Sequence, residues 1–246
     1  MDRRGNEEEG EGEEVVYLDE SFFINDDYRL TEFTFGPHLV QLYCLQSAST
    51  DFDLTGQLVW PGATLLNEYL SKNVDILRGC AVIELGSGVG ITGILCARFC
   101  RAVVLTDHND EVLKVLNKNI DLQSSLENAG SCASSGLAAE KLEWGNSEHI
   151  SRILKSYQDG FDLILGADIC FQQASIPSLF QTVKQLLQVK GKGKCKFILG
   201  YMSRAKMMDV MVVSEATLLG LFITEVPGTR SVVGNLGGVI YEITLI

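Results

Sequence analysis

The stretch VIELGSGVGITG, Val82–Gly93, decides how this chain is interpreted. It joins an apolar run to four glycines, and a second apolar run follows. The first run is typical of a buried strand and the second of a helix. In a strand–turn–helix unit, glycines let the backbone approach a ligand, and the helix N-terminus supplies free N–H groups. The stretch therefore predicts a ligand-binding turn in an α/β domain.

Strands and helices alternate on both sides of this stretch. Apolar runs predict strands at residues 81–85, 102–107, 141–144, 162–168, 196–202, 221–226 and 239–246. Apolar residues at helical spacing predict helices at residues 63–70, 91–100, 111–123, 176–188 and 204–219. Residues 124–139, rich in Ser, Gly and Ala, predict a flexible loop. Such alternation is typical of a parallel sheet, and the last two strands, with no helix between them, should form an antiparallel hairpin.

The chain is interpreted as one folded domain with an acidic extension. A chain of 246 residues can bury one substantial core. Residues 15–45 predict a small N-terminal β element, because YRLTEFTF and HLVQLYCL are strand-like. Residues 59–246 are predicted to form a Rossmann-like core, so the domain covers residues 15–246. Residues 1–14 are predicted to be a disordered tail, because a Gly/Glu run repels itself and cannot bury apolar area.

Charge and cysteine content restrict the partners and the location. The net charge is −12, and residues 1–20 carry nine acidic residues against two arginines. The rest of the chain also lacks the basic surface of a nucleic-acid enzyme. No secretory signal or membrane span is expected, because no apolar stretch has the required position or length. Seven cysteines without a CxxC pair favour reduced thiols and no metal site, in the cytoplasm or alternatively the nucleus.

The glycines fit two classes of cofactor. Gly88, Gly90 and Gly93 match the G-x-G-x-x-G pattern of dinucleotide-binding proteins. Glu84, however, precedes the glycines at the end of the strand, where a carboxylate repels a pyrophosphate and attracts a cation. The charge therefore favours S-adenosyl-L-methionine over NAD. Asp107 ends the next strand, where an acid accepts hydrogen bonds from the ribose of either cofactor; capping the next helix is its alternative role.

Five segments occur in an order that resembles one protein family. They are GQLVWPGATLLNEYL, ELGSGVGITGILCA, LTDHNDEVLKVLNKNI, LEWG and GADICF. Together they resemble the family 16 seven-β-strand methyltransferases, over residues 15–246. That family contains protein-lysine methyltransferases that act on chaperones and translation factors, and a histidine methyltransferase. The resemblance implies a seven-strand sheet with an antiparallel last strand, S-adenosyl-L-methionine as cofactor, a protein substrate and a monomeric enzyme.

The resemblance also implies roles for individual residues. The implied cofactor-binding residues are Trp60 beside the cofactor, Glu84, Gly86, Ser87, Gly88 and Gly90 in the methionine-binding loop, Asp107 at the ribose, Glu143 and Trp144 at the adenine, and Ala167 beside the transferring methyl group. Asp168 is implied next to the same methyl group, where its carboxylate holds and orients the acceptor amine. Core packing is the alternative for both tryptophans, and helix capping is the alternative for Asp168.

The sequence departs from the family at the acceptor side. The family signature Asp-x-x-Tyr reads Asp168-Ile169-Cys170-Phe171 in this chain. Phe171 keeps the aromatic face, so cation–π contact and desolvation of the acceptor are retained without the hydroxyl. Asp168 and Phe171 are therefore the catalytic candidates. The N-terminal β element and the edge around Phe171 are expected to frame the substrate groove.

The function expected is methyl transfer to an amine nitrogen, with a protein lysine as the first acceptor. Such transfer from a sulfonium is an in-line displacement, in which the enzyme supplies proximity and alignment. A small molecule or another protein side chain is the alternative acceptor. A protein that binds the cofactor without transfer is an alternative of a different class, suggested by Phe171. An NAD-dependent oxidoreductase is the rival with a related fold, and Glu84 disfavours it.

Overall fold

The computed structural model describes residues 28–46, 52–127 and 136–246. The predicted acidic tail and the first part of the predicted β element lie outside the described residues. The remainder of that element is an antiparallel hairpin of β1 (Arg29–Phe35) and β2 (His38–Cys44). The predicted N-terminal β element is therefore confirmed for the part that the structure describes, where its two strands pair antiparallel.

The main sheet is built around the glycine-rich turn. Its strands are β3 (Ala81–Leu85), β4 (Ala102–Asp107), β5 (Gly136–Lys141), β6 (Leu163–Ala167), β7 (Lys196–Ser203), β8 (Leu221–Glu225), β9 (Ser231–Val233) and β10 (Leu236–Leu245). Their order is β5-β4-β3-β6-β7-β10-β8, with β9 paired to β10. The first five in this order are parallel, whereas β10 is antiparallel to β7 and β8. The predicted α/β sheet with an antiparallel last strand is confirmed.

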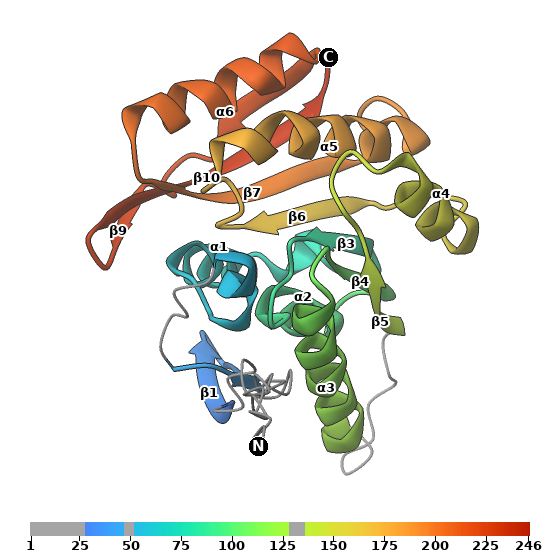
Figure 1. The fold of residues 1–246 in the computed structure, drawn as a ribbon, viewed down its shortest axis with the longest axis vertical. Coiled ribbons are helices and arrows are strands. Elements are labelled where there is room, and N and C mark those ends of the chain that lie inside the picture. The colour runs from blue at the N-terminus through green and yellow to red at the C-terminus, as the bar shows by residue number, and fades with distance from the viewer. Residues whose placement is uncertain (1–27, 47–51, 128–135) are drawn as a thin grey trace, which may run out of the picture.

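Helices cover both faces of this sheet. They are α1 (Pro61–Lys72), α2 (Ile91–Ala97), α3 (Asp110–Glu127), α4 (Ser147–Ser156), α5 (Ile176–Lys190) and α6 (Lys206–Leu218), with 3-10 turns η2 (Phe52–Gln57), η3 (Val74–Ile76) and η4 (Gln173–Ser175). The first three helices lie on one face and the last three on the other (Figure 1). Alternate residues of β3 enter different cores: Ile83 packs toward one cluster and Val82 toward the other.

The third strand of the prediction was wrong. The structure places β5 at Gly136–Lys141, so it begins inside the predicted flexible loop and shares only Lys141 with the predicted strand at residues 141–144. The loop prediction is therefore wrong for residues 136–139. β5 pairs with β4 at the edge of the sheet and is only half-buried, so it forms without the β-branched residues that signal a strand. Helix α4 and strand β9 were not predicted. Residues 142–145 instead form the connection at the carboxyl end of β5, which is the ligand-binding edge of the sheet.

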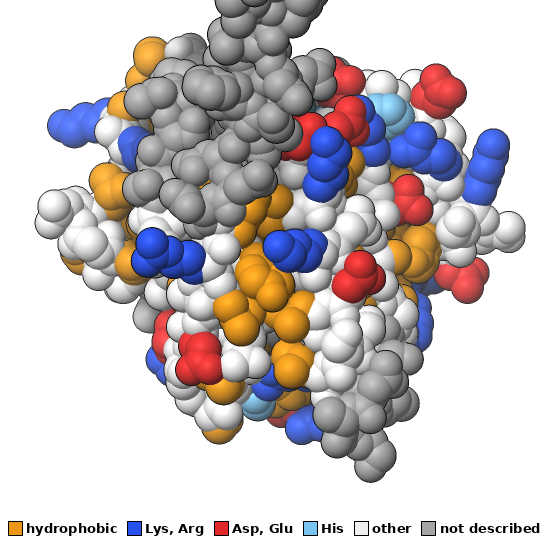
Figure 2. All heavy atoms as spheres, turned by 60° about the horizontal axis from the view of Figure 1, so that its bottom comes forward, with side chains coloured by type: hydrophobic (Ala, Val, Ile, Leu, Met, Phe, Trp, Pro, Cys, Tyr) orange, Lys and Arg blue, Asp and Glu red, His pale blue; other side chains and the backbone are white. Residues whose placement is uncertain are grey.

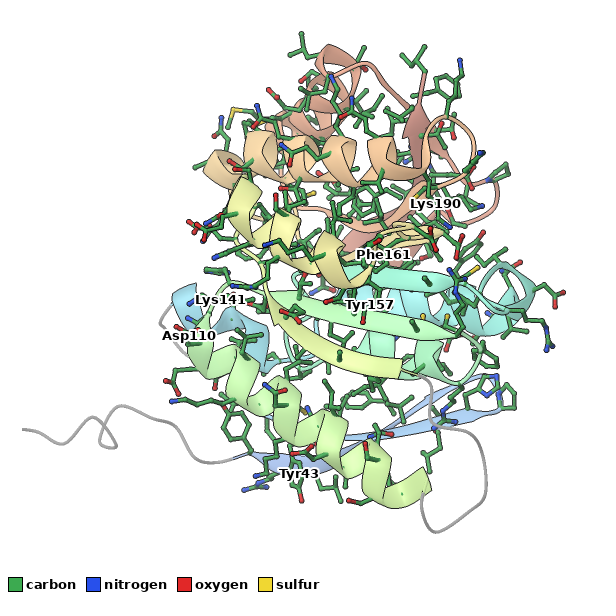
Figure 3. The ribbon with its side chains drawn as sticks, turned by 90° about the vertical axis from the view of Figure 1, so that its right-hand side faces the viewer. Tyr43, Asp110, Lys141, Tyr157, Phe161 and Lys190 are labelled. Atoms are coloured by element: carbon green, nitrogen blue, oxygen red, sulfur yellow. The ribbon has the colours of Figure 1, made fainter. Side chains whose placement is uncertain are left out.

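Two sets of polar contacts tie the hairpin and β5 to α3. Asn119 of α3 accepts a hydrogen bond from the Tyr43 N–H group at 2.7 Å, and its Nδ2 donates to the carbonyls of Tyr43 at 3.0 Å and Val89 at 2.9 Å. Lys141 Nζ donates to both carboxylate oxygens of Asp110 at 2.7 Å, which ties β5 to the start of α3 (Figure 3). The hairpin is therefore attached to α3 and, through it, to the turn after β3.

The charged side chains are intermixed on the end of the molecule that carries the hairpin. Figure 2 shows basic and acidic groups interspersed around a small group of hydrophobic side chains.

No helix in the described ranges combines the length and the apolar content that crossing a bilayer requires.

Candidate active site

A cavity opens at the carboxyl ends of the parallel strands. Its volume is about 280 Å³, and its walls come from the turn after β3, the ends of β4 and β6, the connection after β5 and the segment before α1. Open α/β sheets bind their ligands at this edge, where the helix N-termini also point. The cavity is therefore the candidate active site.

The cavity brings together the predicted site residues with one exception. Its lining includes Trp60, Glu84, Gly86, Ser87, Gly88, Asp107, Glu143, Trp144, Ala167, Asp168 and Phe171. Gly90 does not line it. Gly90 is the N-cap of α2 with φ of 89°, and a Cβ there would lie 2.5 Å from Leu116 Cδ1. Its lack of a side chain therefore serves the packing of α2 against α3, as well as the left-handed backbone.

Glu84 combines burial with a backbone hydrogen bond. It is 2% exposed, and its Oε2 accepts a hydrogen bond from the Gly93 N–H group at 2.9 Å. Burial raises the pKa of the Glu84 carboxyl to about 7, although the Gly93 hydrogen bond opposes that rise. The Ser87 and Thr92 hydroxyls line the same cavity and also favour the ionised form of the Glu84 carboxyl. A buried acid with hydroxyl groups beside it fits a ligand that carries a cation and polar groups.

Asp107 holds the glycine turn from the end of β4. Its Oδ2 accepts a hydrogen bond from the Gly88 N–H group at 3.2 Å. Its Oδ1 accepts from the N–H groups of His108 at 2.8 Å and Asn109 at 3.1 Å. The α3 cap is a different residue, because Asn109 Oδ1 accepts from the N–H of Glu111 at 2.9 Å. Helix capping therefore does not account for Asp107, which faces the cavity.

The two tryptophans line the cavity from different segments of the chain. Trp60, the N-cap of α1, donates from its Nε1 to the Thr55 carbonyl at 2.8 Å, which fixes the ring over the segment before α1. Trp144 lies across the turn after β3, and a Cβ on Gly86 would come within 3.2 Å of its Cζ2 atom. Trp144 is partly buried against the core cluster and also lines the cavity. Core packing and a cavity wall are thus combined in Trp144.

Asp168 is engaged by the protein on both carboxylate oxygens. It follows β6 and has φ of 58°, and its side chain is 1% exposed. Its Oδ2 accepts from the Gly62 N–H group at 3.1 Å and from Arg204 Nη2 at 3.0 Å, while its Oδ1 accepts from Arg204 Nη1. The predicted helix after Asp168 begins at Ile176, so Asp168 is not its cap. The carboxylate meets the cavity as half of an ion pair.

The two residues that end the signature differ in exposure. Phe171 is 41% exposed and lines the cavity, so its ring is available to an acceptor. Cys170 is buried, and burial raises the pKa of its thiol to about 12, with the nearby Asp168 charge adding to the effect. The Cys170 thiol therefore stays protonated at neutral pH and does not act as a nucleophile.

The expectation that the N-terminal β element frames the substrate groove stays a prediction, because the first part of that element lies outside the described residues. The described hairpin itself does not line the cavity. None of residues 28–46 lines it, because the hairpin packs on α2 and α3. The wall comes instead from η2, where Thr55 and Gly56 line the cavity and Gly56 O lies 2.6 Å from the position of a Cβ on Gly88. No pattern in the sequence indicates this contact apart from Gly56 itself, and none indicates the pairing of Arg204 with Asp168.

The cavity is acidic. The acids in its lining are Glu84, Asp107, Glu143 and Asp168, and no lysine or arginine occurs among the described residues that line it. Among the described residues of that lining, His108 is the one basic side chain. A pyrophosphate would meet like charges there, whereas a cationic ligand would meet opposite ones.

The strand order and this edge cavity define a protein with the class I methyltransferase fold. The magnesium protoporphyrin IX methyltransferase of Synechocystis PCC 6803, solved with bound S-adenosylmethionine, has the same fold with a TM-score of 0.53. The two share 12% identity, and the match covers 81% of this chain and 86% of that one. The chain belongs to the lysine methyltransferase family Methyltransf_16, whose model matches residues 44–212.

The chain is also similar to individual proteins named as lysine methyltransferases. The chain is 34% identical over 158 residues to protein N-lysine methyltransferase METTL21A of Danio rerio, covering 63% of this chain and 64% of that protein. It is 29% identical over 150 residues to calmodulin-lysine N-methyltransferase of Arabidopsis thaliana, covering 60% of this chain and 46% of that protein. The chain thus spans less than two thirds of the length of these relatives.

Proposed function

We propose that the chain is an S-adenosyl-L-methionine-dependent N-methyltransferase that acts on a protein lysine. The observation that carries the proposal is the acidic cavity at the carboxyl edge of the sheet, with the buried Glu84 in its lining. The methyl donor carries a sulfonium and an ammonium group, so it matches this charge, whereas NAD brings a pyrophosphate that does not. Family membership supports the same reaction.

The residues present fit the donor at each of its ends. Glu84 would pair with the ammonium group, with the Thr92 hydroxyl beside it. Asp107 would accept hydrogen bonds from the ribose hydroxyls, and Glu143 and Trp144 would line the adenine, where an aromatic ring can stack. When bound, the donor supplies an electrophilic methyl group on its sulfonium.

The chain's own task at the acceptor is to orient a nitrogen and remove water. A lysine Nζ must lose a proton before it can attack, because its unperturbed pKa of about 10.4 keeps it charged at neutral pH. Desolvation against the rings of Phe171 and Trp60 lowers that pKa and favours the neutral amine. The proton leaves to water at the open rim, where Phe171 is exposed. The cavity walls then align the lone pair with the methyl group.

Protein substrates are favoured by the named relatives. METTL21A is a protein N-lysine methyltransferase and the Arabidopsis relative is a calmodulin-lysine N-methyltransferase. By resemblance to the family, a chaperone or translation factor is the substrate class proposed for this chain, which we take to act as a monomer. A cytoplasmic or nuclear location is proposed with it, since the described cysteines are all free.

The experiment is transfer of labelled methyl groups from the donor into whole-cell extract. Wild type should label one or a few protein bands on lysine, and Glu84→Gln should label them much less. Arg230→Met, which breaks the exposed Arg230–Glu225 pair away from the cavity, is the control and should label as wild type does. Labelling that is confined to a dialysable fraction would assign the acceptor to small molecules instead.

A non-catalytic donor-binding protein is the second candidate. It is favoured by Phe171 in place of the family tyrosine and by the engagement of Asp168 with Arg204. Donor binding without labelling in any extract would support this candidate and would exclude the first.

A further inference from the structure

The turn after β6 has an unusual backbone at Asp168. Among the described residues Asp168 is the only non-glycine with positive φ, at 58°. A residue with a Cβ atom reaches this left-handed region only at a cost, so surrounding contacts must hold it there. The same turn places Ala167, Ile169 and Phe171 in the cavity wall. Whatever holds Asp168 therefore also shapes the acceptor side of the site.

Three elements converge on Asp168. Its N–H group donates to the Gly200 carbonyl of β7 at 2.8 Å. Its carboxylate accepts from the Gly62 N–H group in the first turn of α1 at 3.1 Å, and from both terminal nitrogens of Arg204 just beyond β7. The fork of an arginine matches a carboxylate in two parallel bonds, so Arg204 fixes the orientation of Asp168 as well as its charge.

The backbone of α1 and β7 packs closely around Asp168. A Cβ on Gly62 would lie 2.6 Å from Asp168 Cβ, and a Cβ on Gly200 would lie 2.8 Å from the Gly62 carbonyl oxygen. Asp168 cannot turn toward an incoming ammonium without breaking its bonds to Gly62 and Arg204. The hydrogen bond to Asp168 also raises the pKa of the Arg204 guanidinium, so Arg204 keeps its charge.

We propose that Arg204 is a positioning residue for the transfer, and that the Arg204–Asp168 pair forms the acceptor side of the site in place of a free carboxylate. The proposal rests on the proposed function. It deepens that function by naming the form of the acceptor: an amine that is neutral when it lies against Phe171, because the Asp168 carboxylate of the same turn is already paired with Arg204. Arg204 acts through Asp168, by holding the turn that carries Ala167.

The test is a cycle of Arg204→Met, Asp168→Asn and the double variant. Arg204→Met leaves a buried carboxylate without its partner, which is strongly unfavourable. Asparagine tolerates the left-handed backbone and its amide oxygen can still accept from Gly62, so the double variant restores neutrality without the pair. Arg230→Met, which removes an exposed arginine that also binds a carboxylate, is the matched control.

Two kinds of readout follow, one of them independent of activity. Hydrogen exchange of the Gly62 amide should accelerate at least roughly tenfold in Arg204→Met and slow again in the double variant. The initial rate of methyl incorporation into cell extract should fall at least roughly tenfold in Arg204→Met, with the KM for the donor changed less than about threefold. The double variant should recover most of the wild-type rate of methyl incorporation. Arg230→Met should match wild type in both the transfer rate and the exchange of the Gly62 amide.

Some results would overturn the proposal. Suppose that Asp168→Asn has no methyl-transfer activity and that the double variant has none either. Asp168 would then act on the acceptor as an acid in its own right, and Arg204 would have no positioning role. Equal exchange at Gly62 in wild type and Arg204→Met would also refute it. Should Arg204→Met fail to fold, Arg204→Lys replaces it: the charge without the fork should give an intermediate rate, and a wild-type rate would contradict the positioning role.

Failure of the proposed function gives a separate result. If wild type binds S-adenosylhomocysteine but labels nothing in extract, methyl transfer is excluded. Comparing the exchange of the Gly62 amide in wild type, Arg204→Met, Asp168→Asn and the double variant still decides whether Arg204 holds the turn.

Discussion

The Gly93 N–H group of α2 donates a hydrogen bond to Glu84 Oε2 at 2.9 Å, so the acid near the end of β3 is bound by the first turn of the helix that follows the glycines. The helix N-terminus favours the ionised carboxylate, while burial favours the protonated one. With its pKa raised to about 7, Glu84 is divided between both forms at neutral pH. A cationic ligand should therefore shift it to the ionised form.

Ligand binding should release protons. At pH 6.5, S-adenosylhomocysteine brings an ammonium group to Glu84, which then ionises and releases up to about one proton for each molecule bound. Isothermal titration in two buffers of different ionisation enthalpy measures this number. Glu84→Gln should bind more weakly and release none through this site. Equal proton release in wild type and Glu84→Gln would show that Glu84 is not the ammonium ligand.

The same acid should make stability fall as the pH rises. Because burial raises the folded-state pKa of Glu84 from 4.5 to about 7, the folded protein keeps a proton that the unfolded chain has lost. Its stabilising contribution is fully present below pH 4.5 and is lost as the pH rises through about 7. Relative to Glu84→Gln, wild type should lose on the order of 3 kcal/mol across this window. Urea unfolding of both proteins at several pH values measures the difference, and parallel curves would contradict it.

Gly93 is required by packing rather than by the ligand. A Cβ there would lie 1.9 Å from Leu105 Cδ2 and 3.0 Å from Glu84 Oε2. Gly93→Ala should therefore lower the free energy of unfolding by about 1–3 kcal/mol through overpacking. Gly237→Ala is the matched control, because a Cβ at Gly237 meets nothing within 4 Å. Thermal unfolding compares the two, and equal midpoints would rule out the crowding at Gly93.

Asn119 should be a main attachment of the hairpin. Asn119→Ala removes the hydrogen bonds to Tyr43 and Val89 and leaves buried backbone groups unpaired. The expected loss is about 3 kcal/mol of unfolding free energy. Asn117→Ala on the same helix removes one exposed hydrogen bond, to the Leu113 carbonyl, and should cost less than about 0.5 kcal/mol. Chemical denaturation of both variants would contradict the account if their losses were equal.

The parts of the fold that the sequence predicted are those with strong local signals. The apolar runs of β3 and β4 and the helical spacing of α3 and α5 are visible without the structure. The turn after β3 was predictable for the same reason, since its glycines and Glu84 are adjacent in sequence. β5 was missed because GLAAEK has no β-branched residue and is held in place by pairing with β4.

The remaining site residues depend on contacts between distant segments. Arg204 lies 36 residues from Asp168, and no local pattern indicates that the partner of Asp168 follows β7. Thr55 and Gly56 belong to η2, a segment without apolar periodicity. Its position at the cavity depends on the packing of Gly56 against Gly88. Such contacts follow from tertiary packing, which a single sequence does not display.

The central claim is that this cavity takes a cationic methyl donor. The most direct measurement is isothermal titration of the full chain with S-adenosyl-L-methionine and, separately, with NAD. We expect S-adenosyl-L-methionine to bind at least about 100-fold more tightly than NAD, because the acidic lining attracts the sulfonium and ammonium groups and repels a pyrophosphate. Glu84→Gln should reduce the ratio between the affinity for the methyl donor and the affinity for NAD. Equal or tighter binding of NAD to the wild-type chain would contradict the account.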